Sequence, residues 1–107
     1  MTFQQLDSLI AASGRRSLAS SLVAHIIDAM DQNLVGLDLD EFQKDTQYIR
    51  NNITSVASYL QAHGVIDVLY FRDGDGERSY DHQNKYGRWA KQHYRVTETV
   101  RRLYRRD

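Results

Sequence analysis

The chain contains no cysteine and no proline in its 107 residues. Without cysteine, the protein has no disulfide, no thiolate-bound metal and no thiol nucleophile, a composition typical of the reducing cytoplasm. Without proline, no helix is broken by a residue that lacks a backbone N–H, so the chain is compatible with a helix-rich fold. Long apolar runs are absent as well. We therefore expect a cytoplasmic protein with neither a signal peptide nor a membrane span.

Motifs for catalysis and metal binding are also missing. The histidines show no HxH or HxxxH spacing, and there is no Gly-rich phosphate loop or nucleophile elbow. The Asp/Gly-rich run at 73–77 invites comparison with a calcium loop. An EF-hand, however, needs Gly at its sixth position and Glu at its twelfth, where this chain has Arg78 and Asn84. We expect no enzyme activity, no bound metal and no cofactor.

The formal net charge is zero, but the two signs are separated along the chain. Residues 1–84 hold six Arg and Lys against twelve Asp and Glu, whereas residues 85–107 hold eight against two. This asymmetry indicates an anionic partner for the C-terminal end, most often nucleic acid or an acidic protein face. A basic helix that neutralises acidic neighbours within its own fold would give the same pattern.

The rest of the chain is organised around a helical pattern at 49–66. The apolar residues Ile49, Ile53, Val56, Ala57 and Leu60 fall on one face of an α-helix. The opposite face has no carboxylate and consists of Arg50, Asn51, Thr54, Ser55, Ser58 and Gln61. Short hydrogen-bonding side chains suit contacts with base edges and phosphates, although a merely solvated face would look the same. Gly64 is expected to end the helix in a left-handed conformation.

Apolar residues at helical spacing predict further helices before this one. They lie at 3–12 and at 17–31, the second with Ser17 as its N-cap. A short helix is expected at 39–44, followed by a turn at 45–48. Two helices joined by such a turn, the second with a polar face, describe a helix-turn-helix.

Specific residues mark the start of the short helix predicted at 39–44. Asp38 as N-cap places Glu41 three residues into the helix, which predicts a capping box. The same alignment places Leu37 before the cap and Phe42 at the fourth helical position, which predicts a hydrophobic staple.

The C-terminal half reads as two strands and a helix. Apolar and aromatic residues predict strands at 65–72 and 93–96, with a tight Asp-Gly turn at 73–76. The segment 77–92 is compatible with a long hairpin or a loop. Thr97 is expected to cap a last helix. Its packing side holds Val100, Leu103 and Tyr104, and its other side Arg101, Arg102, Arg105 and Arg106.

Two segments carry a family resemblance, I-T-S-V-A-S-Y-L-Q-A-H-G-V-I at 53–66 and Y-R-V-T-E at 94–98. With the order of elements, they resemble the winged helix-turn-helix DNA-binding domains. The resemblance implies a single α+β, mostly helical domain over 1–107. Its parts are an accessory helix at 1–14, a helical core at 17–66, a wing at 65–96 and a basic C-terminal helix at 97–107. The long segment between the wing strands and the single Arg on the recognition face depart from the family pattern.

The resemblance also implies that a helix at about 50–63 reads the major groove of double-stranded DNA, as in a small transcriptional regulator. The residues expected to contact DNA there are Arg50, Asn51, Asn52, Thr54, Ser55 and Ser58. Arg72 and Arg78 flank the wing tip, where neighbouring carboxylates oppose a DNA contact. The expected phosphate contacts are Lys85, Arg88, Lys91 and Arg95, with Tyr86 and Trp89 interleaved. Those aromatic rings alternatively pack the wing against the body.

Other interpretations remain open from the residues. A protein-binding winged helix, acting as an adaptor or inhibitor, is favoured by the neutral net charge and the acidic wing tip. RNA binding through the Arg-rich C-terminus is a weaker option. The apolar side of the helix at 3–12, or that of the C-terminal helix, is expected to extend the core or to form a homodimer.

Overall fold

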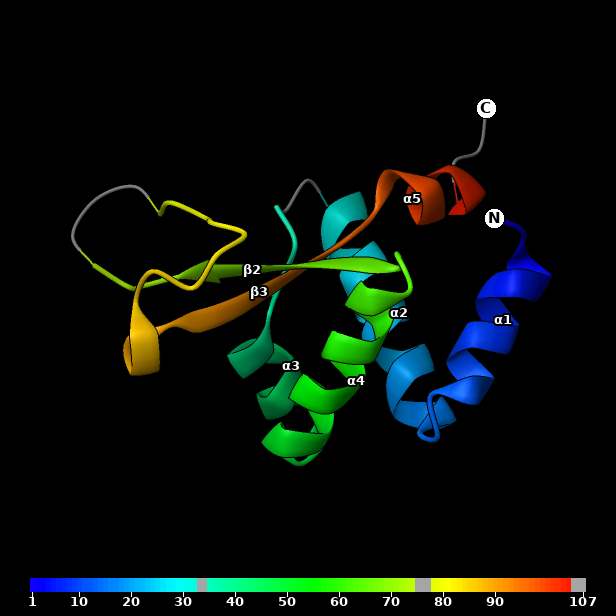
Figure 1. Ribbon diagram of the computed structural model, residues 1–107, viewed down its shortest axis with the longest axis horizontal. Helices are drawn as coiled ribbons and strands as arrows, with labels where there is room; N and C mark the ends of the chain where they lie inside the picture. Colours follow the sequence, from blue (N-terminus) through cyan, green and yellow to red (C-terminus); the bar gives the residue numbers. More distant parts are fainter. Residues whose placement is uncertain (33–34, 75–77, 105–107) are drawn as a thin grey trace.

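The computed structural model describes residues 1–32, 35–74 and 78–104 (Figure 1). Within these ranges the domain is α+β and mostly helical, with five α-helices and a three-stranded antiparallel sheet. The helices are α1 (Phe3–Ala12), α2 (Arg16–Asp31), α3 (Leu39–Thr46), α4 (Arg50–Ala62) and α5 (Glu98–Tyr104). The strands are β1 (Leu37–Asp38), β2 (Ile66–Phe71) and β3 (Lys91–Val96), and a 3₁₀ turn, η1 (Gly87–Trp89), precedes β3. No helix in the described ranges is long and apolar enough to cross a membrane.

The sheet has the strand order β1-β3-β2, so the last strand in the sequence lies in the middle. Leu37 pairs with Tyr94 on one side of β3, and Val68 pairs with the same Tyr94 on the other side. The two residues just before α3 thus form a short strand. β3 begins two residues before the predicted strand, at Lys91.

The described residues between β2 and β3, 72–74 and 78–90, form a loop with the 3₁₀ turn η1 and not a long hairpin. Its only bridge among the described residues pairs Asp81 with Tyr70 on the free edge of β2. Both backbone hydrogen bonds are present, Tyr70 N to Asp81 O at 2.7 Å and Asp81 N to Tyr70 O at 2.9 Å. The predicted turn at 73–76 falls partly outside the described residues, as do Asp75 and Glu77.

The helices α2, α3 and α4 pack against one face of the sheet, and α1 packs beside α2 (Figure 1). One core joins these layers, with Leu22, Ile26, Phe42, Leu60 and Tyr94 all fully buried. The apolar stripe of α4 lies in this core, as predicted. Its first member is an exception.

The exception is Ile49, whose side chain is 66% exposed. Ile49 lies at the N-cap of α4 with an extended backbone, so its side chain no longer follows the helical period. Gly64 ends the helix at φ +74°, in the predicted left-handed conformation. The turn before α4 likewise uses a left-handed residue, Gln47 at φ 64°.

One predicted helix start and one predicted capping box are wrong. α2 begins at Arg16, so Ser17 lies inside the helix and caps nothing. Asp38 does lie at the N-cap of α3, but its side chain makes no capping hydrogen bond. The carboxylate is bound instead to His93 and Arg78, so the predicted capping box with Glu41 does not form.

The start of α5 is as predicted and also fixes the end of α4. The Thr97 hydroxyl accepts a long hydrogen bond from Val100 N at 3.5 Å and donates to the carbonyl of Gly64 at 2.8 Å. Val100 is fully buried, whereas Tyr104, expected on the packing side, is 42% exposed. Arg105 and Arg106 lie outside the described residues.

Gly36, next to β1, is required by a close approach of the chain to β3. A Cβ atom there would lie 2.5 Å from the carbonyl oxygen of Tyr94 and 2.6 Å from Nε2 of His93. Gly36→Ala should therefore lower the free energy of unfolding by about 1–3 kcal/mol, the usual cost of overpacking. Gly74→Ala is the matched control because nothing lies within 4 Å of its Cβ position. Urea unfolding of both variants checks the prediction, which equal losses would contradict.

Candidate nucleic-acid interface

The exposed residues of α4 include Asn51, Ser55 and Ser58. These residues are separated by four and three positions, so they form one line along the helix, and α4 contains no carboxylate. The opposite side of α4 is anchored in the core by Ile53, Val56, Ala57 and Leu60. A rigid helix thus presents small hydrogen-bonding groups to the solvent.

Two residues predicted for this face are differently placed. The Thr54 hydroxyl donates to the backbone carbonyl of Asn51 at 3.1 Å, so its proton is engaged within the helix. Asn52 is half-buried and lines a groove with Tyr48 and the α1–α2 turn around Arg15. It therefore does not share the face of Asn51.

Arg50, the cation at the start of α4, is bound to α3. Its Nη1 lies 2.6 Å from Oδ1 of Asp40, and both side chains are about half exposed. The pair is fixed in geometry but open to solvent, where an ion pair contributes only about 0–1 kcal/mol. The guanidinium is held near the first turn of α4, and its charge is largely neutralised.

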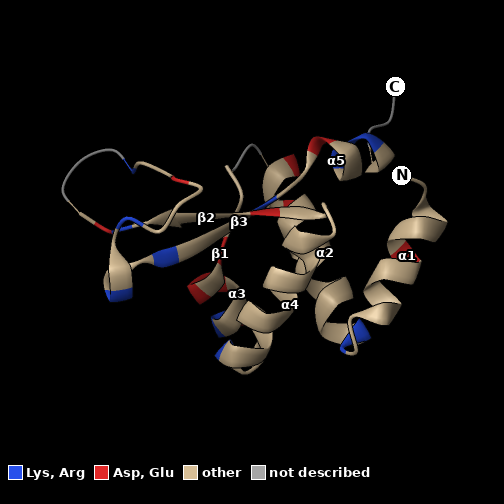
Figure 2. Cartoon of the chain, viewed as in Figure 1, with Lys and Arg blue, Asp and Glu red and all other residues tan. Residues whose placement is uncertain are grey.

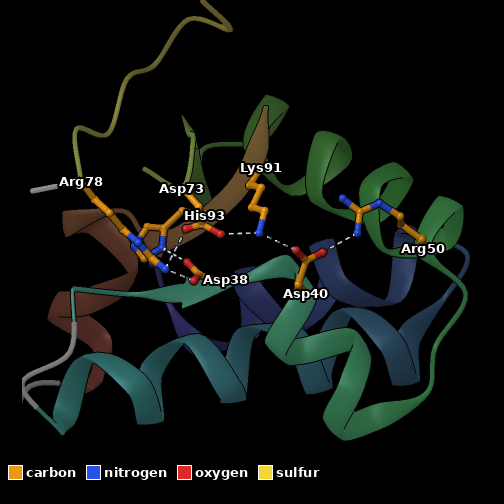
Figure 3. Close-up of polar contacts among 7 residues, drawn as sticks. All are labelled: Asp38, Asp40, Arg50, Asp73, Arg78, Lys91 and His93. Carbon is orange, nitrogen blue, oxygen red and sulfur yellow. Dashed lines mark hydrogen bonds and ion pairs between the residues drawn. The ribbon is translucent and has the colours of Figure 1, made fainter. Parts of the chain in front are cut away.

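The Arg50–Asp40 pair is one end of a row of charges of alternating sign (Figure 3). In order, the charged side chains are Arg50, Asp40, Lys91, Asp73, Arg78 and Asp38, and the row ends at the imidazole ring of His93. It runs from α4 across α3 and β3 to the loop after β2 (Figure 3). Side-chain contacts thereby connect α4, α3, β3, the loop after β2 and β1.

Lys91 and Arg78 each contact two carboxylates of the row. Lys91 Nζ is hydrogen-bonded to Asp73 and lies 3.9 Å from Asp40 Oδ2. Arg78 lies 3.0 Å from Asp38 and 3.1 Å from Asp73. The hydrogen bond from Lys91 lowers the pKa of Asp73 and raises that of Lys91, so both stay charged. Each of these cations therefore has its charge balanced by the protein itself.

The buried end of the row is the pair of His93 and Asp38. His93 is only 3% exposed, and its Nδ1 lies 2.6 Å from Asp38 Oδ1. Burial alone would raise the pKa of Asp38, but hydrogen bonds from His93 and Arg78 lower it below its ordinary value. The carboxylate accepts, so Nδ1 of His93 carries the proton. The other ring nitrogen, Nε2, is buried without a hydrogen-bond partner.

A strap formed by residues 78–81 covers His93. The Tyr80 ring lies over that of His93 with centroids 4.4 Å apart, and the Arg95 guanidinium lies 5.0 Å from the Tyr80 ring. Arg78 lies 4.6 Å from the ring of Phe71. Arg78 and Arg95, predicted to contact DNA, are therefore engaged in holding the strap on the sheet.

The remaining predicted wing cations differ in their surroundings. Lys85 is paired with Asp81 at 3.0 Å. Arg88 lies 5.2 Å from the ring of Trp89, and Trp89 is 63% exposed. Arg72 is exposed, and within the described ranges neither Arg72 nor Arg88 has an ion-pair partner. Trp89 thus lies at the surface and does not pack the wing against the body.

The charge row is the feature that sequence reasoning missed. Asp38 and His93 are 55 positions apart and meet because β1 pairs with β3 in the register Asp38↔His93. A two-residue strand gives no periodic signal, so no pattern in the sequence identifies this pairing. The acidic residues at 38–41 do carry a signal, but local capping explains it equally well.

The described part of the chain gathers no three His, Asp, Glu or Cys side chains in a way that would hold a metal ion. The candidate site is a surface built from α4, the charge row and the exposed residues Arg88 and Trp89 before β3. Comparisons of the chain with protein-family models, with curated proteins and with solved structures give no match.

Proposed function

We propose that this domain is a winged helix-turn-helix that binds double-stranded DNA with sequence preference, as a small transcriptional regulator does. The observation that carries the proposal is the exposed line Asn51, Ser55 and Ser58 on α4, free of carboxylates and backed by a fully buried face. An α-helix fits the major groove of B-DNA, where Asn pairs with adenine and Ser accepts or donates. The turn from α3 and the order β1-β3-β2 are compatible with this fold.

Phosphate contacts are assigned to Arg88 and Arg72, which are exposed wing cations without an ion-pair partner among the described residues, whereas Arg95 is half-buried beside the Tyr80 ring. Arg50 contributes only where a base edge or phosphate replaces Asp40 as its partner. Because only two exposed wing cations in the described ranges lack an ion-pair partner, we expect a shallow dependence of affinity on salt. Each phosphate neutralised makes the slope of log affinity against log salt concentration more negative by about 0.9.

Replacing Asn51 by alanine tests the reading helix. A ligand selected from random duplexes by the wild-type protein should bind Asn51→Ala about 5- to 150-fold more weakly, the equivalent of about 1–3 kcal/mol for one bidentate base contact. Gln61→Ala is the matched control, since Gln61 is exposed at the other end of α4. Fluorescence anisotropy at low and physiological salt measures both.

Equal weakening by both substitutions would contradict the assignment of Asn51, and Arg50→Ala then tests the neighbouring position. If the protein binds no duplex at low salt, the proposal that it binds double-stranded DNA is wrong. Circular dichroism of the variants confirms that the exposed changes leave the fold intact.

A second candidate function is protein binding by a winged helix that does not contact DNA. The observation that favours it is the charge row, in which Asp38, Asp40 and Asp73 neutralise cations that a DNA-binding surface leaves available. Tight binding to one protein, with little dependence on salt and no affinity for duplex DNA, would support this function.

A further inference from the structure

A groove lies between α1, α2 and α5, at the end of the molecule where α1 and α5 are found (Figure 1). Its apolar lining includes Val23 and Ile27 of α2 and Leu103 of α5. Phe3 and Tyr104 border the groove with their rings 5.2 Å apart, and these side chains are 54% and 42% exposed. Exposed aromatic rings beside an apolar groove are typical of surfaces that bind another protein.

Charges of both signs surround this groove. Asp28 and Asp31 of α2 are exposed and line it, while Arg101 and Arg102 are exposed on the neighbouring α5 (Figure 2). Asp28, Asp31 and Arg101 have no ion-pair partner in the described ranges, and Arg102 lies 3.6 Å from Glu98. The same end of the molecule thus offers an acidic and a basic element, each accessible.

We propose that the groove binds a second copy of the chain and forms a two-fold symmetric dimer. In such a dimer every contact occurs twice, so the surface must be complementary to itself. Here the basic α5 of one copy faces the acidic α2 of the other, and the reverse contact is identical. The apolar lining and the rings of Phe3 and Tyr104 are then covered. A partner of purely basic or purely acidic character would satisfy only one of the two elements.

Sedimentation of the whole chain tests the dimer directly. The wild-type protein should sediment as a dimer at about 100 µM, a concentration at which even a micromolar dissociation constant gives nearly complete association. A wild-type protein that remains monomeric at that concentration would overturn the proposal. DNA is not needed for this measurement, so its outcome is separate from that of the proposed function.

Charge reversal tests the surface. Variant A carries Asp28→Arg and Asp31→Arg, and variant B carries Arg101→Glu and Arg102→Glu. Each variant alone should dimerise at least about tenfold more weakly, because like charges face each other in both contacts. A mixture of A and B restores attraction in both contacts, so heterodimers should form at near wild-type affinity.

The matched control is Glu41→Arg with Asp45→Arg, which makes the same change of charge at exposed positions of α3. This control should dimerise like the wild type. Homodimers of A or B as stable as the wild type, or a mixture that stays monomeric, would overturn the proposal. Circular dichroism separates loss of association from loss of folding.

Discussion

Phe42→Ala should be the most destabilising single substitution considered for this domain. Phe42 is completely buried, stacks on Tyr48 at 6.0 Å between ring centroids and meets the edge of His25 at 5.1 Å. Truncating a buried Phe costs about 3–5 kcal/mol, because transfer energy is lost and a cavity remains. Domains of this size have a free energy of unfolding of about 5–15 kcal/mol, so the substitution would remove a large part of it.

Phe3→Ala is the matched control for this prediction, because Phe3 is the same residue type at 54% exposure. Its contact with Tyr104 contributes about 1 kcal/mol, so the loss should be much smaller. Urea unfolding at one temperature, at a protein concentration low enough for the chain to be monomeric, gives both values. Similar decreases in the free energy of unfolding for the two variants would mean that the core is not organised around Phe42.

Asp38→Ala should be the second most damaging change, for a reason unrelated to helix capping. The substitution leaves Nδ1 of the buried His93 without its partner and removes one carboxylate from Arg78. Removing one member of a largely buried pair costs about 3 kcal/mol. Glu41→Ala tests the capping box that does not form, and it should change the stability by less than about 0.5 kcal/mol.

Lowering the pH should remove the difference in the free energy of unfolding between Asp38→Ala and the wild type. The pKa of Asp38 is depressed in the folded state below its ordinary 3.8, so the folded protein holds this proton less tightly than the unfolded chain. The contribution of Asp38 is therefore complete above about pH 4 and is lost as the pH falls through the folded-state pKa. Urea unfolding at pH 7 and at progressively lower pH measures the convergence. A constant difference across this range would contradict the assignment.

Local periodic features of this fold were predictable, and features that depend on pairing across the chain were not. The helices α2 and α4 follow from apolar residues repeated at the helical period, and Gly64 and Thr97 mark ends that depend on one residue type. β1 has two residues and exists only because β3 lies beside it. The same chain-distant pairing brings Asp38 to His93, so the sequence suggested a cap where the structure has a buried pair.

In the candidate interface, too, local features were predictable and tertiary contacts were not. The sequence predicted Asn51, Ser55 and Ser58 on the exposed side of α4, because helix geometry alone assigns them to one face. It did not predict that Arg50, Arg78, Lys85 and Lys91 are each paired with a carboxylate. The sequence gives the number of cations, whereas the tertiary contacts determine which of them are paired within the protein and which are left to bind another molecule.

The central position of β3 has a consequence for the newly synthesised chain. Both β1 and β2 pair with β3, yet β3 is the last of the three strands to leave the ribosome. Until residues 91–96 emerge, β1 and β2 have no strand between them, and the helical face that the sheet covers stays partly uncovered. Early in translation the nascent helices are thus a candidate client for chaperones that hold exposed apolar surface.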